Sequence, residues 1–222
     1  MSLHFDKELS RLRKLVFTLS ARVDENVGRA VKAVEETNAE VAVEVIDSDH
    51  RIDEMEVEVE EECLKALALY QPVAIDLRYI IAVLKMNSDL ERIGDLAVNI
   101  AKSGKRLSSL PKTELPLNLS EMGDHVKAIL KKSLDALINL DSDLAREVLS
   151  DDDRIDEMRS RMSRRLSDKM DDDFEHREVY LQLISVVRRL ERIGDHATNI
   201  AEDVIYMVDA EIVRHQGEII ED

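Results

Sequence analysis

Tryptophan is absent from this 222-residue chain, and aromatic residues make up only 3% of it. With so few rings, base stacking is excluded as a main mode of ligand recognition, and the core has to be aliphatic. Cations are also in the minority, because 31 Lys and Arg are set against 48 Asp and Glu, for a net charge of −17. Nucleic acid is therefore excluded as the main ligand, since neutralising its phosphates requires clustered cations.

Cysteine, proline and glycine are scarce as well. The single cysteine, Cys63, excludes an intrachain disulfide and fits a reducing compartment, and its position on an apolar helical face predicts a small core residue. Six Gly and three Pro leave few breaks, which favours long helices. There is no apolar run of membrane-spanning length and no apolar signal-peptide region, so we expect a chain that is neither membrane-spanning nor secreted by a signal peptide.

One twelve-residue segment occurs twice. Residues 90–101 read LERIGDLAVNIA and residues 190–201 read LERIGDHATNIA, so ten of the twelve positions are identical. A second shared segment, RIDEM, occupies residues 51–55 and 154–158. These offsets of 100 and 103 residues indicate an internal duplication into two similar halves.

Apolar residues recur at steps of three and four through both halves and predict six long helices. We expect them at about 5–37, 39–70, 72–107, 119–140 and 143–171, with a sixth from the acidic residues 171–173 to about His215. Two prolines mark residues 108–118 as a linker. The predicted fold is all-α: two tandem antiparallel three-helix bundles, at 1–107 and 119–222.

Each copy of the long segment places a Glu and an Asp four residues apart, on one face of a helix. The apolar stripe through Leu77, Ile80 and Leu84 continues onto Glu91 and Asp95, so we expect these acids on the core face; the stripe from Leu181 and Ile184 does the same in the second half. A buried carboxylate needs a cation or a hydrogen-bonded partner. With the acids around RIDEM, the candidate set is Asp49, Asp53, Glu91, Asp95, Asp152, Asp156, Glu191 and Asp195.

Two interpretations of these acids remain open. If the second and third helices of each half are neighbours, four carboxylates converge per half and repel one another unless a multivalent cation lies among them. Oxygen-only ligands suit Mg²⁺, Ca²⁺, Mn²⁺ or iron. Alternatively, the acids form a solvated or salt-bridged face, and the adjacent cations are Arg51, Arg92, Arg154 and Arg192.

Four further residues share this face. Asn99 and Asn199 lie one turn beyond each Asp and are candidates either for supporting contacts to a metal site or for ordinary helix-face hydrogen bonds. Gly94 and Gly194 lie beside the acids, where a missing side chain makes room for a metal cluster or for a closely packed helix.

Catalytic signatures are missing from the sequence. It contains no glycine-rich phosphate loop, no recognisable nucleophile–base arrangement and no Glu-x-x-His pair of the di-iron type. We therefore expect a protein that is not an enzyme. The alternative is a metal-dependent enzyme or metal-storage bundle that uses the same carboxylates.

The doubled LERIGD and RIDEM segments, together with QPVAIDLR at 71–78, resemble the PhoU family of phosphate-signalling regulators over nearly the whole chain. This resemblance implies a cytoplasmic negative regulator of phosphate uptake. Its partners would be the ATPase subunit of a phosphate ABC transporter and a PhoR-type sensor histidine kinase, with the membrane reached only through them. The resemblance also implies multinuclear iron or zinc clusters on the eight acids named above. An elongated bundle with long apolar stripes is, in addition, a candidate homodimer.

Overall fold

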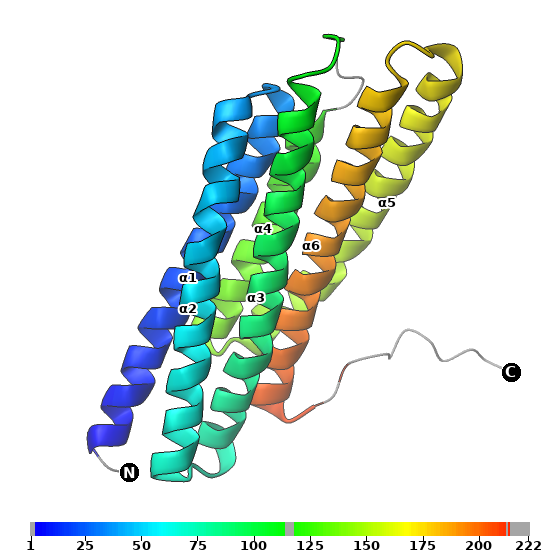
Figure 1. Cartoon of the computed structure of the whole chain (residues 1–222). Helices are drawn as coiled ribbons and strands as arrows, with labels where there is room; N and C mark the ends of the chain where they lie inside the picture. Colours follow the sequence, from blue (N-terminus) through cyan, green and yellow to red (C-terminus); the bar gives the residue numbers. More distant parts are fainter. Residues whose placement is uncertain (1–2, 114–117, 212, 214–222) are drawn as a thin grey trace, which may run out of the picture.

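A computed structural model describes residues 3–113, 118–211 and 213, and within these ranges the chain forms six α-helices and no strand (Figure 1). The predicted all-α class is confirmed. The helices are α1 (Leu3–Glu35), α2 (Ala39–Tyr70), α3 (Ala74–Leu107), α4 (Leu119–Asn139), α5 (Ser142–Asp172) and α6 (Arg177–Asp209).

The six helices form two antiparallel triplets, as the duplication predicted. Helices α1, α2 and α3 pack against one another, and α4 and α5 both pack against α6 and each other. The triplets meet where α3 lies along α6 and α1 along α4, so the two helices that carry the LERIGD copies are neighbours (Figure 1). One continuous aliphatic core runs through all six helices.

The stripes read from the sequence make up much of that core. Every residue of the α1 stripe is buried, and this set is Leu9, Leu12, Val16, Leu19, Val23, Val27, Ala30 and Val34. Cys63 is fully buried on α2, as expected, and burial together with the nearby glutamates raises the pKa of its thiol to about 12.

The predicted boundaries of the sixth helix are wrong. Asp171 and Asp172 end α5 instead of opening α6, because the apolar stripe of α5 continues through Leu166 to the partly buried Met170. Asp173 forms the turn, where its carboxylate accepts hydrogen bonds from the Tyr180 hydroxyl (2.8 Å) and the His176 backbone N–H (3.3 Å). At the other end α6 stops at Asp209, and the predicted end at His215 falls outside the described residues.

The first helices of the two triplets differ in length. Helix α1 has 33 residues, whereas α4 has 21. Lys132 of α4 reaches Asp151 of α5 at 2.7 Å, and counting from that pair in antiparallel register puts the first residue of α4, Leu119, beside about residue 164 of α5. The last two turns of α5 therefore have no α4 beside them. No helix among the described residues is long and apolar enough to cross a membrane.

Candidate functional site

Both LERIGD copies lie in the middle of long helices, with the RIDEM helix of the same half alongside. The acids flank the buried stripe instead of lying on it, so the core-face prediction is wrong. On α3 the buried neighbours are Leu90 and Ile93, while the side chains of Glu91 and Asp95 keep 28% and 46% of their surface exposed. The stripe was extrapolated from Leu77, which is itself 39% exposed, and a small error in helical phase moved the acids onto the wrong face.

A glycine lies opposite the acids of the neighbouring helix in each half. A Cβ on Gly94 would lie 3.2 Å from Ile52 and 3.9 Å from the Asp49 carboxylate, and one on Gly194 would lie 3.1 Å from the Asp152 carboxylate. The glycines thus serve the close helix packing that was one of their two predicted roles. That packing brings an Asp of α2 beside α3, and an Asp of α5 beside α6.

Carboxylates of neighbouring helices consequently act on one another. Burial and the charges of Asp53 and Asp95 raise the pKa of Asp49. In the second half, burial together with Asp195 and Asp156 raises the pKa of Asp152 to about 6. Carboxylates of α2 and α3, and of α5 and α6, therefore lie near enough for their charges to affect one another, and the convergence of four acids per half stays a prediction.

The cations beside these acids differ between the halves. In the first half, Arg92 lies 3.4 Å from Glu91 and 3.3 Å from Asp95, which was one of the predicted pairings. In the second half, the cation is Arg159 of α5, which lies 3.3 Å from Glu191 and was not among the predicted partners. Sequence offset places Glu56 at the equivalent position in the first half, where its charge helps to raise the pKa of Glu91.

The chemistry of these side chains fits a hard or borderline cation, because they supply only oxygen ligands and their mutual repulsion would fall on binding one. Within the part of the chain that is described, however, no three His, Cys, Asp or Glu side chains are grouped closely enough to hold an ion. Holding an ion on either face therefore requires side-chain rotation.

Comparison with known proteins agrees with the doubled motif. The model of the PhoU domain matches the chain twice, at residues 16–104 and 119–204. The chain belongs to the PhoU family. A PhoU homologue named as a phosphate-specific transport system accessory protein in Aquifex aeolicus is 39% identical over 95% of each chain. The protein of that name in Escherichia coli is 32% identical over 96% of this chain and 88% of its own.

Two solved structures of the PhoU family match the fold. The crystal structure of PhoU from Pseudomonas aeruginosa superposes with a TM-score of 0.88 at 37% identity, over 93% of this chain and all of that one. The phosphate transport system regulatory protein PhoU from Streptococcus pneumoniae gives a TM-score of 0.87 at 30% identity, over 94% and 99% of the two chains.

Sequence reasoning missed the polar contacts between the two PhoU repeats. His196 and Asn199 of α6 both reach Asp89 of α3, at 2.8 and 3.2 Å. Thus Asn199, one of the two candidate supporting residues, contacts the other repeat instead of the acids of its own motif. A further contact between the repeats is made by Arg189 of α6, which donates a hydrogen bond to the Ser103 hydroxyl of α3 at 3.0 Å. One signal was available: Asp89 and Arg189 precede the two LERIGD copies and carry opposite charges.

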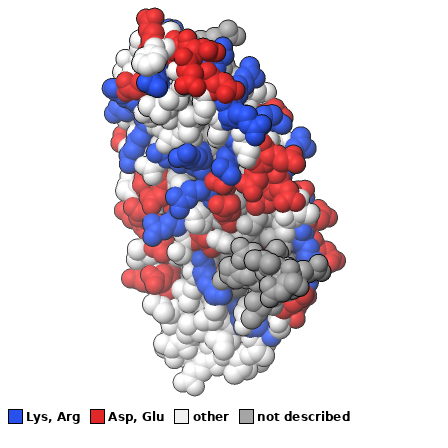
Figure 2. Space-filling view, turned by 90° about the vertical axis from the view of Figure 1, so that its right-hand side faces the viewer, with Lys and Arg blue, Asp and Glu red and all other residues white. Residues whose placement is uncertain are grey.

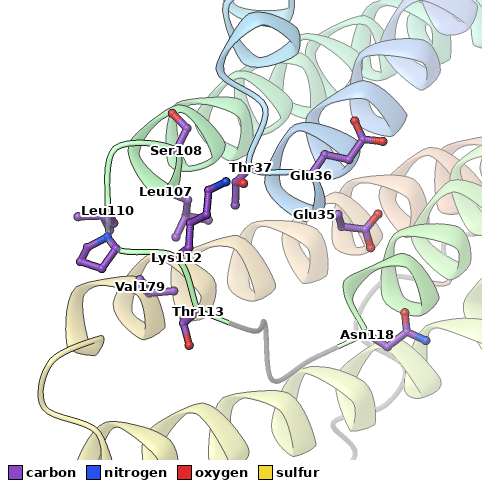
Figure 3. Close-up of a pocket in the computed structure, with 11 residues that line it drawn as sticks. Glu35, Glu36, Thr37, Leu107, Ser108, Leu110, Lys112, Thr113, Asn118 and Val179 are labelled. Carbon is purple, nitrogen blue, oxygen red and sulfur yellow. The ribbon is translucent and has the colours of Figure 1, made fainter.

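A hollow of about 680 Å³ lies at one end of the bundle (Figure 3). It is surrounded by Thr37 after α1, Leu107 at the end of α3, Lys112 and Val179 near the start of α6. None of the eight repeated acids lines it. The hollow begins about 18 Å along α3 from Asp95, given the rise of a helix, so it is separate from the acid faces.

Proposed function

We propose that this chain is a negative regulator of phosphate uptake and of phosphate-starvation signalling. The observation that carries the proposal is the doubled LERIGD segment on two adjacent helices, within a chain that matches PhoU proteins over nearly its whole length. These relatives are named as accessory and regulatory proteins of phosphate transport, which supports a regulatory role.

In this proposal the chain acts in the cytoplasm as a non-enzymatic adaptor. It binds the ATPase subunit of a phosphate ABC transporter and a PhoR-type sensor histidine kinase, and represses uptake when phosphate is ample. Long exposed helix faces on both repeats offer room for two partners. Failure of the purified chain to bind either protein would contradict the adaptor role.

Phosphate uptake by cells that lack this chain, grown in phosphate-rich medium, tests the regulatory role. We expect uptake and phosphate-regulated expression to rise, and the wild-type chain to restore repression. Unchanged uptake after deletion would overturn the proposal.

We further propose that the acid faces bind metal ions, with iron or zinc as first candidates and Mg²⁺, Mn²⁺ or Ca²⁺ as others. The ligands would be Asp49, Asp53, Glu91 and Asp95 in one repeat and Asp152, Asp156, Glu191 and Asp195 in the other. A bound cation would neutralise the converging carboxylates and so cross-link α2 to α3 and α5 to α6. Burial and the charges of neighbouring acids in the same repeat raise the pKa of Asp49 and that of Asp152, which supports this assignment.

A fourfold variant separates the metal from the regulation. Cells carrying Glu91→Gln, Asp95→Asn, Glu191→Gln and Asp195→Asn together are compared with wild type for repression of uptake. The matched control removes four negative charges from exposed acids outside the repeated segments, through Glu25→Gln, Glu40→Gln, Glu61→Gln and Asp124→Asn. Loss of repression in the first variant alone would show that the acid faces carry the signal. Repression by both variants would limit the faces to a structural role.

The same eight carboxylates also favour a second candidate, a metal-dependent enzyme or metal-storage bundle. Metal analysis of the purified chain separates the two functions. A few ions per chain with no turnover would favour the regulator, whereas large loading or turnover would favour the alternative. Light scattering of the same sample tests the expected homodimer.

A further inference from the structure

The second repeat carries a charge-inverted copy of one face of the first. At the offset of 103 residues that aligns the RIDEM segments, Glu58 and Glu62 of α2 correspond to Arg161 and Arg165 of α5. Lys65 corresponds to Asp168, so its charge is inverted as well. Glu61, which lies between these positions, is inverted too, because it corresponds to Arg164.

In the first repeat, Glu58, Glu62 and Lys65 of α2 form ion pairs with the neighbouring helix α1. Arg11 of α1 lies 3.6 Å from Glu58 and 3.3 Å from Glu62, and Glu8 lies 3.8 Å from Lys65. These pairs lie where the beginning of α1 runs along the end of α2. This face of the fold is therefore one on which a neighbouring helix is oriented by ion pairs.

In the second repeat, the described residues include no helix at the corresponding place. Helix α4 begins at Leu119, beside about residue 164 of α5, so it has no counterpart of the first turns of α1. Arg161, Arg164 and Arg165 are exposed, and no described residue forms an ion pair with any of them. They line a shallow surface hollow of about 660 Å³. Figure 2 shows basic side chains gathered between acidic patches on the upper half of the face on which α5 lies.

We propose that this face of α5 docks a helix of a partner protein that presents a carboxylate to the arginines, in the place that α1 occupies in the first repeat. Charge complementarity sets the pattern of that helix. It carries a carboxylate where α1 has Arg11, to meet Arg161 and Arg165, and a cation three residues earlier, where α1 has Glu8, to meet Asp168. The proposal deepens the adaptor function by naming the kind of partner segment that binds.

The surrounding charges favour a helix over a broad anionic surface or a long polyanion. The arginines span only five residues, or about 6 Å along the helix. Asp156 and Glu157 lie on the hollow at one end and Asp168 at the other. These carboxylates repel a uniformly anionic membrane or polyphosphate chain, whereas a helix with alternating charges matches both signs.

Binding of a designed peptide to the full-length chain tests the proposal. The probe is a labelled peptide with the sequence of residues 3–22 of α1, changed by Glu8→Lys and Arg11→Glu, and the comparison peptide has the unchanged sequence. We expect the changed peptide to bind the wild-type chain about tenfold or more tightly than the unchanged one, at low ionic strength, and to weaken steeply with salt.

Charge reversal on the protein completes the test. Arg161→Glu with Arg165→Glu should reverse the peptide preference, so that the unchanged peptide binds more tightly. The control, Lys7→Glu with Lys14→Glu, alters the net charge equally through exposed residues of α1 and should leave the preference intact. Thermal unfolding of each variant verifies that it is folded.

Equal binding of the two peptides, or a preference that survives the Arg161 and Arg165 changes, would overturn the proposal. Tighter binding of inorganic tripolyphosphate or of phosphatidylglycerol vesicles than of the changed peptide, lost in the same variant, would also overturn it in favour of a general anion site. Because none of these measurements involves phosphate uptake, their failure is distinguishable from failure of the regulatory function.

Discussion

His196 of α6 lies with its Nδ1 atom 2.8 Å from a carboxylate oxygen of Asp89 on α3, and this contact joins the two PhoU repeats. Asn199, one turn further along α6, donates to the same oxygen at 3.2 Å. About a fifth or less of either side chain in the His196–Asp89 pair is exposed, so the contact is shielded from water. The LERIGD helices are therefore held to each other by polar groups as well as by the shared core.

A double-mutant cycle should detect this link between repeats. We expect Asp89→Ala and His196→Ala each to lower the free energy of unfolding by about 1–2 kcal/mol, because each leaves a partly buried polar group without its partner. The double variant should lose less than the sum, with a coupling of about 0.5–1.5 kcal/mol. Urea unfolding of the four proteins measures it, and strictly additive losses would contradict a direct interaction.

Three glycines should respond differently to alanine, according to what each new methyl group meets. Gly104→Ala places Cβ 3.0 Å from the Ala33 backbone, which cannot move aside, so we expect a loss of about 1–3 kcal/mol. Gly94→Ala meets the side chain of Ile52 at 3.2 Å and should be milder. Gly28→Ala meets only the flexible end of Lys127 and serves as the control, with a gain of about 0.5–1 kcal/mol from helix propensity. Chemical denaturation tests the order, and a Gly104 variant as stable as the Gly28 variant would contradict it.

Asp152 should make the metal-free protein less stable as the pH rises. Its pKa is raised from 3.8 to about 6 in the folded chain, so the folded state holds this proton more tightly than the unfolded state. Below about pH 4 both states are protonated and the ionisation has no cost. Between pH 4 and 6 the unfolded state loses its proton while the folded state still holds it, so the folded state loses stability as the pH rises. Above pH 6 both states are ionised, and we expect a constant loss of about 1–2 kcal/mol.

The variant Asp152→Asn isolates this effect, because it carries no titrating group at the position. In the presence of a chelator, its stability relative to wild type should increase from pH 4 to pH 6 and then level off. Asp143→Asn, at an exposed position on the same helix, is the control and should show no such increase. A stability difference that is independent of pH would contradict the raised pKa.

Arg159 should weaken metal binding by the second repeat, because it already pairs with Glu191 at 3.3 Å. The first repeat has Glu56 at the equivalent position. The change Arg159→Glu therefore adds a carboxylate to the acid face and frees Glu191 from its ion pair. We expect metal affinity at this face to rise about tenfold or more, with a larger metal-induced increase in Tm. Calorimetric titration with Zn²⁺ or Mn²⁺ measures the change in affinity. Arg161→Glu is the control, because it makes the same charge change on a side of α5 that points away from the acid face. An unchanged affinity in the Arg159 variant would argue against metal binding on the acid face.

Periodicity predicted the all-α class and most helix boundaries, because a long helix that packs on one side needs an apolar residue at every third or fourth position. The α1 stripe from Leu9 to Val34 is buried as expected. Phase errors of a residue or two remained undetected at this level, and they placed Glu91 and Asp95 on the core instead of beside it. The start of α6 was placed too early because local charge at 171–173 was given more weight than the apolar stripe of α5 that reaches Met170.

The sequence by itself determined the duplication, the family and the eight repeated acids, because identical segments in equivalent register have to fold alike. Which helices carry those acids side by side was decided by the tertiary structure. Only the packing of Gly94 on Ile52 and of Gly194 on Ile155 brings carboxylates from separate helices together. The choice of Arg159 as counterion, the Asp89–His196 contact and the open face beyond the short α4 depend on distances across the bundle. Spacing along one chain does not encode such distances, since they follow from how whole helices pack.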